Sequence, residues 1–164
     1  MYSPTIDKVG IVIYDMDSLE DEEGPAEMLL DKTKGTSTYS LGTIGDSLYL
    51  CCAIKSNITL FRWSGDSFLP VQLIQLNDEP NRMEFIGADL LLVGLPGEFT
   101  LVNFEQSTST ALVTYSSKEP PVDILVLDDD YLLCYSSMYH SHHSYSQARH
   151  GYICKYRRPP HTQL

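Results

Sequence analysis

The sequence predicts an all-β fold: a partial β-propeller of about three blades of four-stranded antiparallel sheet, followed by a disordered C-terminal tail. Two observations predict the propeller, namely short apolar runs between polar turns and the recurrence of this pattern. In residues 46–63 an apolar run, Leu48–Ile54, precedes the polar break Lys55–Asn57 and a second run, Ile58–Trp63. This is typical of two strands joined by a tight turn.

The same pattern recurs about 42 residues later, and a period of about 40 residues is typical of propeller blades. Leu48–Leu50 align with Leu90–Leu92, Ile58–Phe61 with Thr100–Asn103, and Tyr131–Cys134 begin a third copy. The 164 residues therefore hold roughly three to three and a half units, whereas a closed propeller has roughly four to eight blades. Open blade edges expose apolar surface, so we also expect self-association through them.

The first expected strand is Val9–Tyr14, because its residues are mostly β-branched. An acidic loop follows over residues 19–24. The next segment, Pro25–Lys32, fits two structures: a short helix with Pro at its first position, or an outer blade strand.

The blades themselves are expected from residue 39 onward, each as a series of short strands. Pro70 suits an outer edge strand, because proline cannot donate a hydrogen bond to a neighbouring strand. The third blade stops after two strands, since the aliphatic pattern ends near Ser136. The expected strands are Tyr39–Ile44, Leu48–Lys55, Ile58–Trp63 and Phe68–Leu76, then Arg82–Ile86, Asp89–Leu95, Glu98–Phe104 and Thr110–Tyr115, then Pro121–Leu127 and Tyr131–Tyr135.

The sequence therefore predicts two parts, a partial propeller over residues 1–136 and a disordered tail over residues 137–164. The tail is rich in His, Tyr, Ser and Arg and has almost no aliphatic residues. Such a composition buries too little apolar surface to order itself. An alternative exon and a read-through end would each produce such a junction.

The net charge is -11, and all 22 acidic residues precede residue 139. An acidic body excludes nucleic acid and anionic lipid as expected partners. No run is long enough to span a membrane, and no signal peptide is predicted. Cys51, Cys52 and Cys134 lie in apolar strand patterns, where free cysteine behaves as a small hydrophobe. We therefore expect a cytoplasmic protein with reduced thiols.

Histidines and acids offer three candidate metal sites, and each has a simpler explanation. The tail holds His140, His142, His143, His150, His161 and Cys154. Such residues suit zinc or copper, but a disordered tail lacks the formed scaffold of a structural site. Asp15 and Asp17 begin a calcium-loop pattern, yet Glu20 occupies the position that requires Gly. Asp128–Asp130 align with blade turns, where aspartate is favoured. We therefore predict no metal and no cofactor.

Catalytic constellations are equally weak. No nucleophile elbow accompanies the Ser, His and Asp residues, and no phosphate-binding glycine motif is present. A propeller hydrolase would need inward-facing acids from several blades, and the inner strands offer Glu84 and Asp123. Trp63, the single tryptophan, is expected to be largely buried against a neighbouring blade. The sequence thus predicts no catalytic residue and no enzyme.

The blade sequences resemble the citron-homology (CNH) domain from about Tyr39 to Tyr135. The residues that carry this resemblance are Cys52–Trp63, Leu73–Pro80, Leu91–Val102, Pro120–Leu125 and Asp130–Tyr135. Within that family they look most like the CNH region of the Rap/Ran GTPase-activating-domain-like proteins. The chain covers about half of such a domain, and its last 29 residues match nothing in the family pattern.

The resemblance implies a protein–protein interaction module in small-GTPase signalling, with small GTPases or their regulators as partners. It implies no catalysis, because a GTPase-activating domain would lie elsewhere in a longer protein. Two alternatives stand beside this hypothesis: a truncated or splice-variant fragment without independent function, and a propeller hydrolase.

Overall fold

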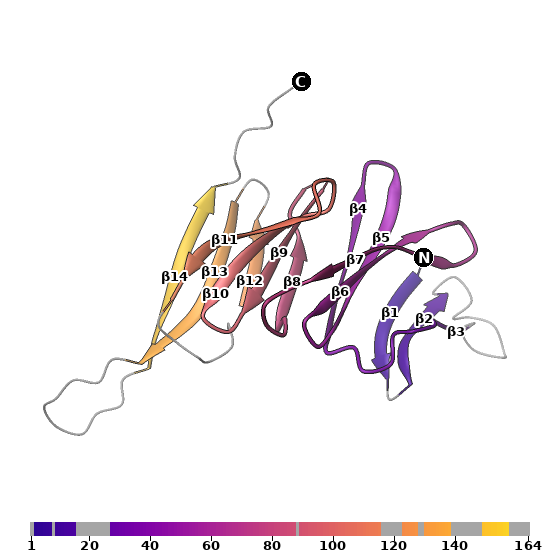
Figure 1. The fold of residues 1–164 in the computed structure, drawn as a ribbon, viewed down its shortest axis with the longest axis horizontal. Helices are drawn as coiled ribbons and strands as arrows, with labels where there is room; N and C mark the ends of the chain where they lie inside the picture. The colour runs from indigo at the N-terminus through magenta and orange to yellow at the C-terminus, as the bar shows by residue number, and fades with distance from the viewer. Residues whose placement is uncertain are drawn as a thin grey trace, which may run out of the picture. The chain divides into compact units, whose positions relative to one another are not determined.

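The computed structural model describes residues 2–7, 9–15, 27–87, 89–115, 123–127, 130–138 and 149–157. Within these ranges every regular element is a β-strand, numbered β1 to β14 (Figure 1). The chain divides into two compact units, Met1–Glu79 and Pro80–Leu164. Over the described ranges, no helix has the length and apolarity needed to cross a membrane.

The first unit contains two antiparallel sheets. A three-stranded sheet has the order β1-β2-β3, and a four-stranded sheet has the order β4-β5-β6-β7. Neighbours in sequence are neighbours in the sheet, which is the meander of a propeller blade. The strands are β1 (Tyr2–Asp7), β2 (Gly10–Asp15), β3 (Glu27–Leu29), β4 (Thr38–Ile44), β5 (Ser47–Ile54), β6 (Asn57–Trp63) and β7 (Phe68–Gln75).

The second unit repeats this arrangement. Its four-stranded sheet has the order β8-β9-β10-β11, and its three-stranded sheet has the order β12-β13-β14. The strands are β8 (Arg82–Phe85), β9 (Leu90–Leu95), β10 (Glu98–Asn103), β11 (Thr108–Thr114), β12 (Asp123–Leu127), β13 (Asp130–Met138) and β14 (Arg149–Arg157).

Tight turns fix the register of the central hairpins. Gly45, with φ 59, is the first residue of the two-residue loop between β4 and β5, which is where a type II′ turn requires a positive φ. Gly97, with φ 82, follows Pro96 between β9 and β10, as in a type II turn. Lys55 holds a positive φ of 54 between β5 and β6 without being glycine.

Each unit has its own hydrophobic core. In the first unit, residues of β2, β5, β6 and β7 pack together with Leu30, so the core joins the two sheets; its buried members are Ile11, Ile13, Leu30, Leu50, Cys52, Phe61 and Phe68. In the second unit the buried members are Ile86, Leu92, Phe99, Ile124 and Leu133, again from both sheets. These cores bury the apolar runs that predicted the strands.

Thr33 ties the loop after β3 to strand β2. It is fully buried; its hydroxyl accepts a hydrogen bond from the Ile11 amide at 2.8 Å and donates one to the Leu30 carbonyl at 2.6 Å. Thr36 in turn donates from its hydroxyl to the Thr33 carbonyl at 2.6 Å. The buried main-chain groups of this loop thereby gain partners that no ladder supplies.

The predicted fold class is confirmed: the protein is all-β, with four-stranded antiparallel sheets of a partial propeller. The strands expected between residues 39 and 135 all form, with ends shifted by a few residues. A short helix and an outer strand were both considered for Pro25–Lys32; this segment contains a strand, β3. Strand β1 precedes Val9–Tyr14, the first strand expected from the sequence.

The C-terminal segment differs from the sequence prediction. Strand β13 continues to Met138, beyond the expected boundary at residue 136, and residues 149–157 of the predicted disordered tail form β14. β14 pairs with β13 over nine residues. Pairing of this kind uses main-chain hydrogen bonds, so the scarcity of aliphatic residues does not prevent it. Residues 139–148 and 158–164 lie outside the described ranges.

Candidate functional site

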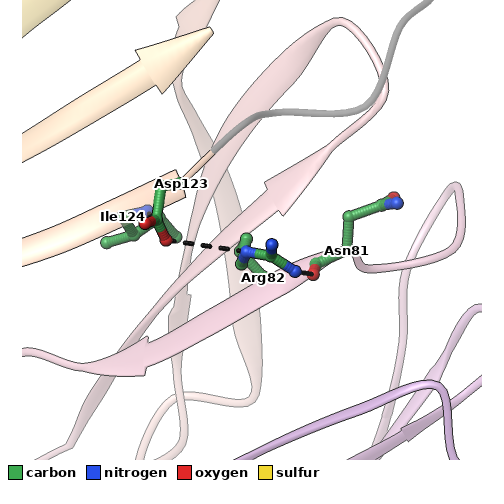
Figure 2. Close-up of polar contacts among 4 residues, drawn as sticks. All are labelled: Asn81, Arg82, Asp123 and Ile124. Atoms are coloured by element: carbon green, nitrogen blue, oxygen red, sulfur yellow. Dashed lines mark hydrogen bonds and ion pairs between the residues drawn. The ribbon is translucent and has the colours of Figure 1, made fainter.

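A small polar cluster lies between the first strands of the two sheets in the second unit. β8 and β12 are neighbours, and the Arg82 Nε lies 3.6 Å from an oxygen of Asp123 (Figure 2). The guanidinium also donates to the main-chain carbonyl of Asn81 at 2.9 Å. Both side chains of the ion pair are about half exposed, so the pair contributes at most about 1 kcal/mol.

Glu84, on β8, adds a second carboxylate to this cluster. Burial raises its pKa above the usual glutamate value, and the charge of Asp123 raises it further. Burial and then Asp123 also raise the pKa of the Cys134 thiol on β13. A thiol with a raised pKa is a weak nucleophile at neutral pH, because the thiolate is the reactive form. The cluster therefore joins β8 to β12 and offers no activated nucleophile.

The first unit carries a groove between the outer strands of its two sheets. The groove has a volume of about 330 Å³ and is lined by Met28–Lys32 on one side and by Phe61 and Ser67–Pro70 on the other. We call it the β3–β7 groove. Most of its lining side chains are apolar. An apolar concavity of this size is suited to hold a few side chains of a bound segment.

The strand beside this groove has an unusual surface. β7 is the last strand of its sheet, and its residues Phe68–Gln75 include no charged side chain. Leu69, Val71 and Leu73 are exposed by 50%, 47% and 66%. Leu29, across the groove, is exposed by 52%. Apolar edge strands attract other strands and are normally protected by charges, so this one is a candidate interaction surface.

Most residues of the candidate metal sites lie outside the described ranges. These are Asp17, Glu20, Asp128, Asp129, His140, His142, His143 and His161. Asp15 ends β2, and His150 and Cys154 fall on β14. Asp130 opens β13 and pairs with Leu127 of β12. In the part of the chain that the structure describes, no group of three His, Cys, Asp or Glu residues is placed to hold a metal ion.

The adjacent cysteines behave as expected from their strand pattern. Cys51 and Cys52 are both buried in β5, and Cys52 belongs to the first core. Burial raises the pKa of both thiols, that of Cys52 to about 12. Both thiols are therefore protonated at neutral pH, and among the described side chains Cys51, Cys52 and Cys134 form no disulfide.

Trp63 is less buried than the sequence predicted. It is the last residue of β6 and only partly buried, packing on the edge of the first core with its ring centroid 5.0 Å from that of Phe68. Its position at the end of a strand accounts for this partial burial.

The sequence predicted neither the contact between the acids of the inner strands nor the β3–β7 groove. The sequence named Glu84 and Asp123 only as the few acids on the inner strands and predicted no contact between them; the structure places them close enough for the charge of Asp123 to raise the pKa of Glu84. The groove has walls that lie about 40 residues apart, so no local motif reveals it. The run of uncharged residues over Phe68–Gln75 was the available signal.

The model of the CNH domain family matches residues 7–162. The chain belongs to the CNH domain family. The match extends through β14, so the C-terminal strand lies within the matched region, contrary to the expectation that the last 29 residues match nothing in the family. It confirms the resemblance inferred from the blade sequences.

A solved CNH domain has a similar fold. The AfRom2 CNH domain superposes with a TM-score of 0.66 and 17% sequence identity, over 84% of this chain and 48% of that chain. Among curated proteins, a GTPase-activating protein of Dictyostelium discoideum is 28% identical over 112 residues. That alignment covers 65% of this chain and 11% of the relative. The chain thus spans about half of the solved domain and a small part of the curated relative.

Proposed function

We propose that this chain is a protein–protein interaction module of a small-GTPase regulator and has no catalytic activity of its own. The observation that carries the proposal is the match to the CNH family together with the relative named as a GTPase-activating protein. The exposed apolar edge strand β7 supports it, because such edges pair with other chains.

The partners would be proteins, namely small GTPases or their regulators. Any GTPase-activating activity would belong to another part of a longer protein. The chain would act in the cytoplasm, where thiols stay reduced; the free thiols of Cys51, Cys52 and Cys134 support this location.

The test is interferometry with the purified chain immobilised and Rap- and Ran-family GTPases in solution, each loaded with GDP or with a non-hydrolysable GTP analogue. We expect saturable binding of at least one GTPase. A parallel assay of phosphate release should show an unchanged rate of GTP hydrolysis when the chain is added. Faster hydrolysis would contradict the proposed lack of catalysis, and failure of every GTPase and known regulator to bind would contradict the proposed partner class.

A further inference from the structure

We propose that β7 and the β3–β7 groove form a docking site for an extended apolar segment of a partner protein, flanked by basic residues, which pairs with β7 as an added strand. This inference rests on the proposed function and specifies the surface and the chemistry of the partner. Strand addition is a common mode of peptide recognition: main-chain hydrogen bonds supply affinity, and pockets for alternate side chains supply specificity.

The edge of β7 provides the main-chain groups. On one side β7 pairs with β6 over Phe68–Gln75, and on the other side no strand lies beside it in the described sheet. Because main-chain groups alternate between the two sides of a strand, about half of those of β7 point away from β6, and Pro70 carries no amide N–H. A bulge after Leu60 shifts the register near Pro70, so an added strand would pair most regularly with the part after the bulge, around Leu73.

The groove provides the side-chain pocket. Leu69 and Pro70 of β7 line one wall and Leu29 and Leu30 line the other, so a strand on β7 would lie beside an apolar concavity. Leu29 and Leu69 are each about half exposed, and a bound apolar side chain would cover them. Burying exposed apolar surface on both partners is the usual source of affinity in such complexes.

Charge decides which molecule pairs with β7, a second copy of this chain or a segment of a partner protein. The chain carries a net charge of -11, which favours a basic segment at this edge over a second copy of the chain and so argues against the self-association expected from open blade edges. The lining of the groove itself holds one acid and one base, Asp31 and Lys32, so the preference for a basic segment comes from the charge of the whole chain. We therefore assign the site to a segment whose apolar residues alternate along the strand and whose ends carry Lys or Arg.

The experiment is selection of a phage-displayed library of random dodecapeptides on the whole chain, followed by fluorescence anisotropy with the enriched peptides. The test variants are Leu69→Asp and Leu73→Asp, and Leu125→Asp is the matched control because Leu125 is an exposed leucine on a different sheet, β12. Circular dichroism checks that all three variants fold. A peptide N-methylated at alternate amides keeps its side chains but loses the main-chain N–H donors along one edge, the edge that would pair with β7.

We expect the enriched peptides to alternate apolar residues between basic ends, to bind Leu69→Asp about tenfold more weakly than the control variant, and to lose binding when N-methylated. Peptides with acidic ends, or peptides that bind Leu69→Asp as well as the unmodified chain, would overturn the inference. A dimer in sedimentation velocity that Leu73→Asp dissociates would also overturn it, because a second copy would then occupy β7.

The same variants separate this inference from the proposed function. If a GTPase binds the Leu69→Asp and Leu73→Asp variants as tightly as the unmodified chain, the interaction function stands and the β7 site fails. If selected peptides bind at β7 while no GTPase or regulator binds, the site stands and the proposed partner class fails.

Discussion

Replacing Thr33 with valine removes one buried hydroxyl while keeping the shape of the side chain. The hydroxyl accepts from the Ile11 amide at 2.8 Å and donates to the Leu30 carbonyl at 2.6 Å. Valine leaves the buried Ile11 amide without an acceptor, which costs about 1–3 kcal/mol, and loses a bond worth about 1 kcal/mol. We therefore expect Thr33→Val to destabilise the protein by about 2–4 kcal/mol.

The matched control is Thr33→Ser, which keeps the hydroxyl and loses one methyl group. Its expected cost is about 1 kcal/mol. Urea unfolding followed by tryptophan emission is the assay, because Trp63 is the single tryptophan and packs against the core of the first unit. With a slope of about 1–3 kcal/mol per molar urea, the valine midpoint should fall clearly below the serine midpoint. Equal midpoints would refute the assigned role of the hydroxyl.

Three further changes test other details of the structure. Among the residues that the structure describes, the buried Ser40 hydroxyl has no hydrogen-bond partner. Ser40→Ala should therefore stabilise the protein by about 1 kcal/mol in urea unfolding. A destabilised variant would show that the hydroxyl is bonded. Lys55 has a positive φ, so Lys55→Gly should raise the melting temperature. Relief of the backbone strain outweighs the entropy cost of glycine by about 0.5–1 kcal/mol. Lys34→Gly is the control: Lys34 has no positive φ, so this variant should lower the melting temperature. Burial and the charge of Asp123 raise the pKa of Glu84, because the folded protein favours the protonated carboxyl. The contribution of Glu84 to folding stability is therefore present below the usual glutamate pKa and is lost as pH rises through the raised pKa. The urea midpoints of Glu84→Gln and of the unmodified chain should therefore be similar at acidic pH, and at neutral pH the midpoint of Glu84→Gln should be the higher one. The opposite trend would contradict the cause assigned to the pKa shift of Glu84.

The sequence was sufficient to predict the blades because each blade repeats the same local pattern. Apolar runs of strand length and turn residues such as Gly45 and Gly97 recur at one period, and the structure folds each copy into an antiparallel meander. The period even places Arg82 and Asp123 at the starts of the first strands of successive sheets, where they form their ion pair.

What the sequence did not reveal depends on contacts between distant segments. β14 pairs with β13 through main-chain groups, so its polar composition gave no strand signal. The β3–β7 groove joins Met28–Lys32 to Ser67–Pro70, and neither segment alone predicts a cavity. Trp63 was expected to be largely buried because tryptophan usually is, but its position at the end of β6 leaves it partly exposed.

Hydrogen–deuterium exchange tests the central claim, that the chain recognises a protein partner through the outer edge of its sheet, most directly. The measurement compares the free chain with the chain bound to the GTPase or regulator that interferometry identifies. We expect slower exchange over Phe68–Gln75, where new main-chain hydrogen bonds form, with β8 and β12 unchanged. Protection gained at β8 and β12, around Glu84 and Asp123, with none at β7 would contradict it.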